Sequence, residues 1–339
     1  MSENLPWMPR WGEGSVIASN EDAFVFSLPG MKALRPEQDT VLALGAFDGV
    51  HLGHQALVRK AIDDAKGRGL PCVAVTFDPD PAVIVGPSAA GSRLLCTTDR
   101  CRGLLALGMD YIVVLRFTPQ LAGLDPAEFV EQTLLRVTHP VSVHVGSNFR
   151  FGHKGAGSVD TLGRLGARLG YEVRAHELME LEGNAISASR IRLLLQEGRV
   201  GEAKALLGRS HAVRGRVEHG RGEGTSLGFP TANVTLDELE CLPKDGVYGC
   251  YFVDGSNVWP AAVNVGAPPS FKSSTSRFLE ANLIGFEGDL YGANVIVTFE
   301  QWLRDSRRFD SLEELTSVVL ENIEWVRSNL GTRRMGVGR

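Results

Sequence analysis

The first half of the chain alternates short apolar runs with segments whose apolar residues recur at helical spacing. Residues 40–47 (TVLALGAF) are apolar and bounded by turn residues, as a buried strand would be. Residues 54–69 then carry apolar side chains at intervals of three and four and stop at a glycine. Further β-rich runs occupy residues 71–79, 111–117, 141–149 and 171–178, with helical stretches at 101–108 and 125–137. This alternation predicts an α/β domain built on a parallel sheet flanked by helices.

The pattern changes in the second half. A helix-like segment covers residues 186–209 and ends near Gly208. Short strands separated by glycine-rich turns follow at residues 211–220, 246–254, 257–266, 278–286 and 293–303, which predicts an antiparallel barrel or sandwich. Residues 311–331 form one long amphipathic pattern, typical of a helix with one buried face. We therefore expect two domains that meet near residue 209, in keeping with a length of 339 residues.

Charge and composition remove several classes of function. The formal net charge is −5, and no apolar run is long enough to cross a membrane, so nucleic acid and membrane partners are disfavoured. The N-terminal residues lack the basic start and apolar core of a signal peptide, which predicts a cytoplasmic protein. Whether the protein forms a homo-oligomer stays open. The five cysteines form no CxxC pair, so we expect buried free thiols rather than disulfides or a zinc site.

Two histidines surround a glycine where the first strand turns into the first helix. His51, Gly53 and His54 belong to the segment GAFDGVHLGH. In an open α/β sheet this corner lies at the carboxyl ends of the strands, where ligands bind, and a helix start offers unpaired N–H groups to an anion. A single histidine near a turn is more often a surface or capping residue. The second histidine, beside Asp48 and Gly49, favours a phosphate-binding site.

Three more segments are expected at the same edge of the sheet: TFDPDP (76–81), GSNFRFG (146–152) and ISASRIR (186–192). Together they suit nucleotidyl transfer, in which a phosphate attacks the α-phosphorus of a nucleotide and pyrophosphate leaves. Ser187, Ser189 and Arg192 lie at a predicted helix start, where they could hold the pyrophosphate. A capped helix with solvated arginines explains that segment equally well by itself.

The second half has its own candidate chemistry. Residues 217–234 contain a glycine-dense stretch whose backbone could approach a polyphosphate, although hairpin loops are often glycine-rich too. Thr231 and Asn233 are two oxygen ligands on one face of a strand, suited to a hard cation such as Mg²⁺. Glu280 is a lone carboxylate in an apolar strand. Such a residue is usually solvent-facing, and the alternative is a general base beside a substrate hydroxyl.

Taken together, these motifs resemble the bacterial bifunctional riboflavin kinase/FMN adenylyltransferase family, the prokaryotic FAD synthetases. The likeness covers residues 42–327 and includes ALLGRSHAVRGRV, LGFPTAN, DGVYG and DLYG besides the segments above. The resemblance implies a Rossmann-like nucleotidyltransferase domain of the HxGH class over residues 15–186. It further implies a linker with the ISxSxIR helix over 187–209, and a riboflavin kinase barrel closed by a terminal helix over 210–335.

The resemblance also implies roles for individual residues. In the first domain, His51 and His54 would stabilise the transferring α-phosphate, and the remaining nucleotide contacts would come from Gly45, Phe47, Asp48, Ser187, Ser189 and Arg192. Asn148 and Phe149 would lie near the flavin. In the second domain Thr231 and Asn233 would bind Mg²⁺ and phosphate, and Glu280 would activate the ribityl hydroxyl of riboflavin. A flap over ATP would include Gly220, Gly222 and Gly228.

The implied function is phosphorylation of riboflavin to FMN and adenylylation of FMN to FAD, with ATP as co-substrate and Mg²⁺ as cofactor. Three positions in the first domain depart from the family pattern: Asp80 stands where a histidine is usual, Ala188 replaces a hydroxyl residue, and Ala185 replaces a basic residue. The second domain shows smaller changes, such as VGAPPSF where an NPTF-like ending is usual. A carboxylate near a triphosphate repels it unless a cation intervenes. The alternatives are therefore a riboflavin kinase with an impaired or altered nucleotidyltransferase domain, and a flavin-binding regulator without turnover.

Overall fold

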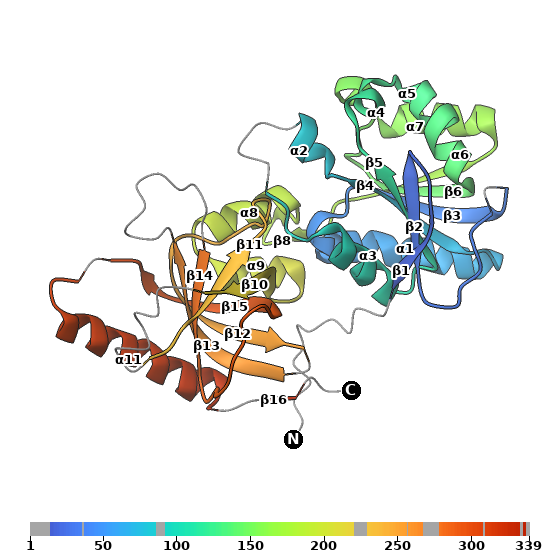
Figure 1. The fold of residues 1–339 in the computed structure, drawn as a ribbon. Helices are drawn as coiled ribbons and strands as arrows, with labels where there is room; N and C mark the ends of the chain where they lie inside the picture. The colour runs from blue at the N-terminus through green and yellow to red at the C-terminus, as the bar shows by residue number, and fades with distance from the viewer. Residues whose placement is uncertain are drawn as a thin grey trace. The chain divides into compact units, whose positions relative to one another are not determined.

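The computed structural model describes residues 14–35, 37–85, 92–219, 229–255, 257–266, 278–307, 309–332 and 335–336. These residues divide into two compact units, which Figure 1 shows. Those up to Ala188 form the N-terminal domain, and those from Ser189 onward form the C-terminal domain.

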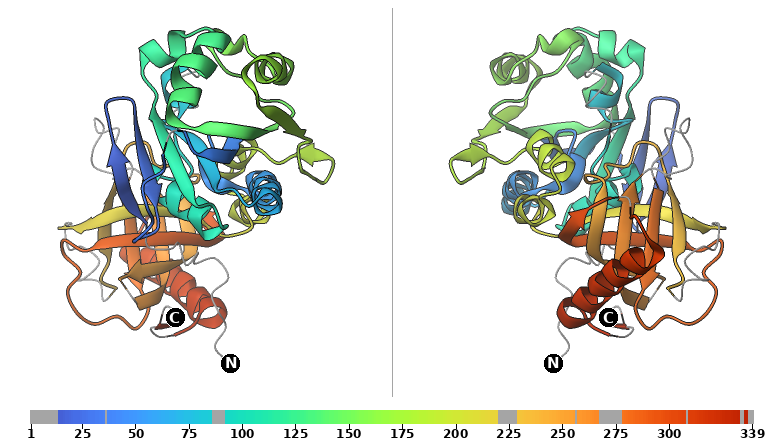
Figure 2. Two further views of the ribbon diagram at one scale, coloured as in Figure 1. Left: turned by 90° about the vertical axis from the view of Figure 1, so that its right-hand side faces the viewer. Right: turned by 90° about the vertical axis from the view of Figure 1, so that its left-hand side faces the viewer.

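A seven-stranded sheet forms the centre of the N-terminal domain, in the order β1-β2-β5-β4-β3-β6-β7. Strands β3 to β7 are parallel, whereas β1 and β2 form an antiparallel hairpin at one edge, drawn in dark blue in Figure 2. The strands are β1 (Ser15–Ser19), β2 (Ala23–Ser27), β3 (Asp39–Leu44), β4 (Cys72–Asp78), β5 (Tyr111–Arg116), β6 (His139–Gly146) and β7 (Glu172–His176). A short hairpin, β8 (Glu180–Leu181) and β9 (Asn184–Ala185), follows.

Both faces of this sheet are covered. On β3, Val41 and Ala43 pack into one apolar cluster, and Leu42 and Leu44 pack into the other. This is why the strand reads as a continuous apolar run. The first face is covered by α1 (Leu52–Arg68) and α3 (Thr97–Ala106). The second is covered by a π-helical segment (Phe129–Leu134) and α7 (Val159–Leu169), with the short α2 (Pro81–Val85), α4 (Pro119–Gly123), α5 (Pro126–Glu128) and α6 (Leu135–Val137) in the connections.

The strand order reverses between β3 and β6. From β3 the chain builds the sheet through β4 to β5, and it then crosses to the other side of β3 to form β6 and β7. In open α/β sheets ligands bind outside the carboxyl ends of the strands at such a switch point. The segment that begins at Gly45 and the segment that begins at Ser147 leave the sheet here.

The expected parallel sheet is confirmed, but the hairpin β1–β2, helix α7 and several short elements were not predicted. The hairpin β1–β2 was missed because β1 is largely exposed and carries no clear apolar pattern. Helix α7 was missed because glycines interrupt its pattern. A Cβ on Gly166 would lie only 2.5 Å from the carbonyl oxygen of Tyr171, so the helix needs glycine there to pack closely.

The C-terminal domain is a closed antiparallel barrel rather than a sandwich. Its strands are β10 (His211–Glu218), β11 (Ala232–Leu236), β12 (Gly246–Asp254), β13 (Asn257–Gly266), β14 (Phe278–Leu283) and β15 (Asn294–Asp305), with the short β16 (Met335–Gly336) beside β13. The order is β12-β15-β10-β11-β14-β13, and pairing of β12 with β13 closes the sheet. Alternate residues fill the interior, such as Tyr248, Cys250 and Phe252 on β12, which have no measurable exposure.

Helices cover the outside of this barrel. Helix α11 (Leu312–Leu330) confirms the predicted terminal helix and packs on β12 and β13, as Figures 1 and 2 show. A Cβ on Gly249 would lie 2.4 Å from the ring of Trp325, so glycine allows the helix to approach the strand. The predicted helix-like segment 186–209 is two helices, α8 (Ala188–Gln196) and α9 (Val200–Leu207). Gly198, with a φ of 79°, breaks the run between them.

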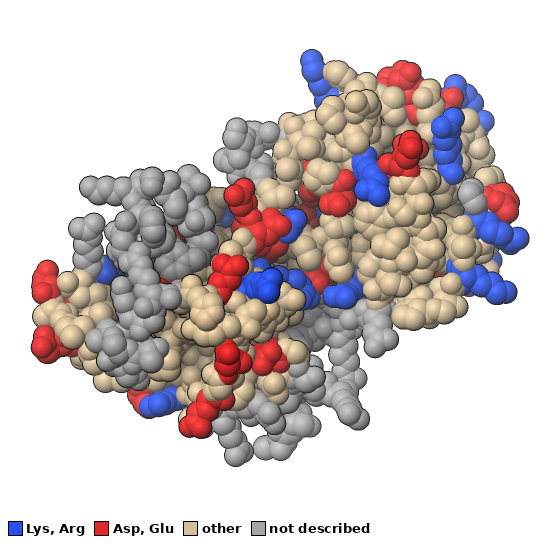
Figure 3. All heavy atoms as spheres, viewed as in Figure 1, with Lys and Arg blue, Asp and Glu red and all other residues tan. Residues whose placement is uncertain are grey.

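The cysteines, the surface charges and the lengths of the helices were also subjects of expectations from the sequence. Cys72, Cys101, Cys241 and Cys250 are buried free thiols, and Cys96 is half-buried. On the face shown in Figure 3, acidic and basic side chains are interspersed over the described surface. No helix within the described ranges is both long and apolar enough to pass through a bilayer.

Candidate functional site

The turn after β3 has an unusual backbone. Phe47, Gly49 and Val50 all have positive φ values, of 53°, 75° and 40°. A β-branched residue such as Val50 rarely adopts this conformation, and strained backbone of this kind persists where surrounding contacts hold it in place, often at functional sites. A Cβ on Gly45 would lie 3.3 Å from the ring of Phe47, so glycine also matters at the start of the turn.

The turn delivers His51 to the start of α1. The Nδ1 atom of His51 accepts a hydrogen bond from the backbone N–H of His54 at 3.3 Å and so caps the helix. The two rings stack with their centroids 3.6 Å apart, and the edge of Phe47 contacts His54. A Cβ at Gly53 would lie 3.2 Å from the ring of His51. The glycine between the histidines therefore leaves room for the stacked pair.

His54 is half-buried with a buried Nδ1 atom, and its ring is neutral. Burial, then the proximity of His51 and Arg100, lower the pKa of His54 well below its usual value. Its Nδ1 atom has no hydrogen-bond partner among the residues that the structure describes. Leaving such a buried polar atom without a partner costs about 1–3 kcal/mol, and a bound substrate oxygen or water can recover that cost.

Asp48 is buried below the turn. Its carboxylate accepts the backbone N–H groups of Leu94 and Leu95 at 3.0 to 3.1 Å. Asp48 therefore ties the segment before α3 to the histidine turn, and its expected contact with the nucleotide stays a prediction.

Asp80 has a positively charged neighbour. Its Oδ1 accepts the backbone N–H of Ala82 at 2.8 Å, and its Oδ2 lies 3.7 Å from Nη1 of Arg100. Arg100 is 2% exposed and donates to the carbonyl oxygens of Ala46 and Phe77, at the ends of β3 and β4. The repulsion that we expected between Asp80 and a triphosphate is therefore offset by a buried cation. Sequence reasoning missed Arg100, since nothing local distinguishes it from a surface arginine on a helix.

The predicted flavin residues follow β6. The backbone N–H of Phe149 donates to the carbonyl of Gly146, which makes a tight turn, and the ring of Phe149 stacks on Phe151. Asn148 is exposed, and its Oδ1 lies 3.2 Å from the position that a Cβ on Gly146 would take. An aromatic surface and an exposed amide thus lie next to each other at the switch point.

The predicted pyrophosphate residues belong to different units. Ser187 is half-buried and lies at the end of the N-terminal domain. Ser189 is exposed and Arg192 is 9% exposed, and both lie on α8 in the C-terminal domain. Their assignment to ATP stays a prediction.

In the barrel, strand register brings the candidate kinase residues together. Asn233 on β11 lies directly opposite Glu280 on β14, and Glu280 lies directly opposite Asn264 on β13. Directly paired residues point to the same side of a sheet with their Cβ atoms about 5 Å apart. Thr231 immediately precedes β11, two residues before Asn233. The neighbours Leu279 and Ala281 are buried in the core, so these polar residues lie on the opposite face of the barrel wall.

Asn264 was not predicted from the sequence, because only the pairing of β11, β14 and β13 brings it beside Glu280. The segment VNVG contains a polar residue, Asn264, within an apolar strand, just as FLEANLI contains Glu280. This shared feature is the sequence pattern that could have indicated Asn264 as a site residue. The flap glycines Gly220, Gly222 and Gly228 lie outside the described residues.

A histidine corner on a parallel sheet and an oxygen-rich face on a closed barrel define a two-domain transferase acting on nucleotides. A FAD synthetase family model matches residues 34–190, and a riboflavin kinase family model matches residues 207–330. The chain belongs to the bifunctional riboflavin kinase/FMN adenylyltransferase family.

Individual relatives support this membership over most of the chain. A bifunctional riboflavin kinase/FMN adenylyltransferase from Pseudomonas fluorescens is 35% identical over 301 residues, covering 88% of this chain and 96% of the relative. The protein of the same description from Escherichia coli K12 is 32% identical and covers 84% and 90%. A crystal structure described as a macrolide-efflux protein from Streptococcus pneumoniae superposes with a TM-score of 0.77 at 32% identity, covering 86% of this chain and 94% of that one.

Proposed function

We propose that this chain phosphorylates riboflavin to FMN in its C-terminal domain and adenylylates FMN to FAD in its N-terminal domain, using ATP in both reactions. The observation that carries this proposal is that the two family matches fall separately on the two domains. Each domain also contains its own group of polar residues suited to the reaction.

In the N-terminal domain, the phosphate of FMN attacks the α-phosphorus of ATP, and the bond to the β-phosphate breaks as pyrophosphate leaves. His51 and His54 contact the transferring phosphate. Their fixed stacking means that no reorganisation is needed as charge moves onto the pyrophosphate, which is where preorganised polar groups contribute most. Asn148 and Phe149 hold the flavin at the neighbouring strand end, and Ser187, Ser189 and Arg192 contact the phosphates of ATP.

In the C-terminal domain, Glu280 accepts the proton of the ribityl hydroxyl while that oxygen attacks the γ-phosphorus of a second ATP and ADP leaves. Thr231 and Asn233 offer hydroxyl and amide oxygens, which are the donors that Mg²⁺ prefers, so these residues fit the cation. Bound Mg²⁺ would neutralise charge on the ATP phosphates. The strand pairing that brings Asn233, Glu280 and Asn264 together supports this placement.

The second candidate function is a riboflavin kinase whose N-terminal domain acts slowly or on another nucleotide. The observation in its favour is Asp80, since a carboxylate so close to the histidine corner alters the charge that a nucleotide meets. The structure weakens the argument, because Arg100 compensates that charge.

The experiment that tests both candidates is a time course with riboflavin, ATP and Mg²⁺, separating riboflavin, FMN and FAD. We expect FMN to rise first and FAD to follow. FMN accumulation without FAD from ATP, together with transfer from another nucleoside triphosphate, would favour the second candidate. If folded protein forms neither product, the remaining hypothesis is a flavin-binding regulator without turnover.

A further inference from the structure

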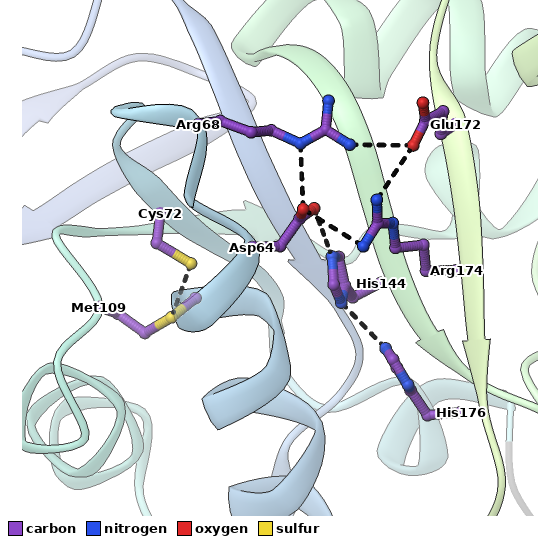
Figure 4. Close-up of polar contacts among 8 residues, drawn as sticks. All are labelled: Asp64, Arg68, Cys72, Met109, His144, Glu172, Arg174 and His176. Atoms are coloured by element: carbon purple, nitrogen blue, oxygen red, sulfur yellow. Dashed lines mark hydrogen bonds and ion pairs between the residues drawn. The ribbon is translucent and has the colours of Figure 1, made fainter. Parts of the chain in front are cut away.

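A polar cluster with a buried centre and an exposed rim links α1 to strands β6 and β7 in the N-terminal domain (Figure 4). Its members are Asp64 and Arg68 on α1, His144 on β6, and Glu172, Arg174 and His176 on β7. The side chain of His144 is 1% exposed and that of Asp64 is 9% exposed. None of these residues belongs to the proposed catalytic or binding groups.

The cluster is a chain of hydrogen bonds. His144 Nε2 lies 3.0 Å from Oδ2 of Asp64, and His144 Nδ1 lies 2.9 Å from Nε2 of His176. The other carboxylate oxygen of Asp64 pairs with Arg68 at 3.0 Å and Arg174 at 3.2 Å. Glu172 bridges the same two arginines on the exposed side.

The protonation states of the three side chains determine which atom donates and which accepts in each of these hydrogen bonds. Burial by itself raises the pKa of Asp64, but the bonds from His144 and Arg68 outweigh it and lower the pKa to about 2, so Asp64 is an ionised acceptor at neutral pH. His144 must then donate from Nε2–H. Burial lowers the pKa of His144 and lowers that of His176 to about 4, so both rings are neutral. The Nδ1 of His144 is consequently an acceptor, and His176 donates to it from Nε2–H.

The cluster connects the two halves of the proposed adenylyltransferase site. Helix α1, which begins at the histidine corner, carries Asp64 near its other end. His176 pairs with Gly146, and its carbonyl oxygen accepts the N–H of Ser147 at 2.8 Å, directly before Asn148. An apolar contact would hold a helix on a sheet equally well, but directional hydrogen bonds specify one register.

We propose that the Asp64–His144–His176 chain positions the flavin turn at Ser147–Phe149 relative to the histidine corner. The inference rests on the proposed adenylyltransferase function of the same domain. His144 and His176 are positioning residues, since neither needs to touch a substrate. A displaced flavin turn would bind FMN less well and so raise its KM, and a misplacement of about 1 Å between two reacting groups can also lower the rate by about a hundredfold.

The test replaces His144 by Phe, which keeps a flat ring and removes both nitrogens. The matched control is His139→Phe, which removes an exposed histidine–aspartate pair on the same strand, with Asp39 at 2.8 Å. We expect His144→Phe to raise the KM for FMN about tenfold or more, with a smaller change in the KM for ATP. Kinase activity of the same preparation should not change, and His139→Phe should match the wild type. His144→Gln, which can donate to Asp64 and accept from His176, should recover part of the loss.

Two further measurements keep the inference testable if His144→Phe disrupts folding. His176→Phe breaks only the outer bond and should also raise the KM for FMN. In the wild type, ¹⁵N NMR should show both His144 and His176 as the neutral Nε2–H tautomer. Equal KM values for His176→Phe and His139→Phe, or an Nδ1–H tautomer for His144, would overturn the inference. A wild type that makes no FAD, with the expected tautomers present, would instead contradict the proposed function.

Discussion

At the scale of single residues, Arg100 determines the charge beneath the histidine corner. Its guanidinium is buried, joins the ends of two strands, and has Asp80 as the nearest carboxylate in an ion-pair contact. Removing one partner of a buried pair leaves an uncompensated charge and costs about 3–5 kcal/mol, whereas removing both costs less.

We therefore expect Arg100→Met to destabilise the N-terminal domain strongly and Asp80→Asn to do so less, because Asp80 lies 3.7 Å away without a direct hydrogen bond. The double variant should be more stable than the sum of the two changes implies. Thermal unfolding of the four proteins in a double-mutant cycle measures this coupling. Arg102→Met, which alters a half-exposed arginine beside Asp99, is the control. Strict additivity of the two free energies would show that the pair does not interact.

Gly53 gives a second prediction at this scale. Alanine is favoured over glycine inside a helix by about 1 kcal/mol, so Gly53→Ala should strengthen α1. The added Cβ would nevertheless lie 3.2 Å from the ring of His51 and shift it. We expect a loss of turnover in FAD formation from supplied FMN, measured by steady-state kinetics, without loss of thermal stability. Gly67→Ala on the same helix meets nothing within 4 Å and should leave activity unchanged.

At the scale of elements, the proposed kinase site depends on the register of the barrel strands. Asn233, Glu280 and Asn264 share a face because β11, β14 and β13 pair without a shift at these positions. A slip of one residue would turn Glu280 into the core and bury a carboxylate there. The same strand register that fills the core of this domain therefore also brings the three polar residues together.

Glu280→Gln keeps the size of the side chain and removes the proposed base. We expect FMN formation to fall by about two orders of magnitude or more, while FAD formation from supplied FMN continues, because the reactions occur in separate domains. Asn233→Ala should also lower FMN formation and should raise the Mg²⁺ concentration needed for half-maximal kinase activity, which a titration of the metal in the kinase assay would measure. Loss of both activities in folded Glu280→Gln protein would refute the assignment of separate sites.

At the scale of the whole molecule, buried histidines predict the response to acid. Burial lowers the pKa of His176 and of His211 to about 4, and lowers that of His54 and His144 as well. The unfolded chain binds protons at these histidines near pH 6.5, before the folded protein does, so stability falls as the pH decreases from about 6.5 to 4. Asp64 adds stability above pH 3.8, which is lost only as the pH falls toward about 2.

We expect the unfolding temperature of both domains to fall progressively as the pH decreases from 6.5 to 4. In the C-terminal domain, protonation of His211 alone should lower the free energy of unfolding by about 3 kcal/mol over this range. The N-terminal domain should be the more sensitive, because it contains His54, His144 and His176 among its described residues. Calorimetry across this pH range measures the two transitions. A melting temperature that stays constant, or rises, as the pH decreases would contradict the burial of neutral histidines.

The sequence by itself determined the kinds of elements and most of their positions. The apolar run at residues 40–47 became β3, the helical spacing after it became α1, and the long amphipathic pattern near the end became α11. These predictions succeed because the period of a helix or strand is a property of the local backbone, which each short segment expresses by itself. The motifs could be recognised from the sequence for the same reason, because their residues are neighbours in the chain.

Only the tertiary structure decided which distant residues meet. Asp64 and His144 are 80 positions apart and share a hydrogen bond, and Asn233 faces Glu280 across a strand pair. In the same way, the pairing of β12 with β13 decides that the second domain is a barrel and not a sandwich. The packing of α3 decides that Arg100 is the charge partner of Asp80. Such contacts are selected by the shape and burial of whole layers, and no local period encodes them.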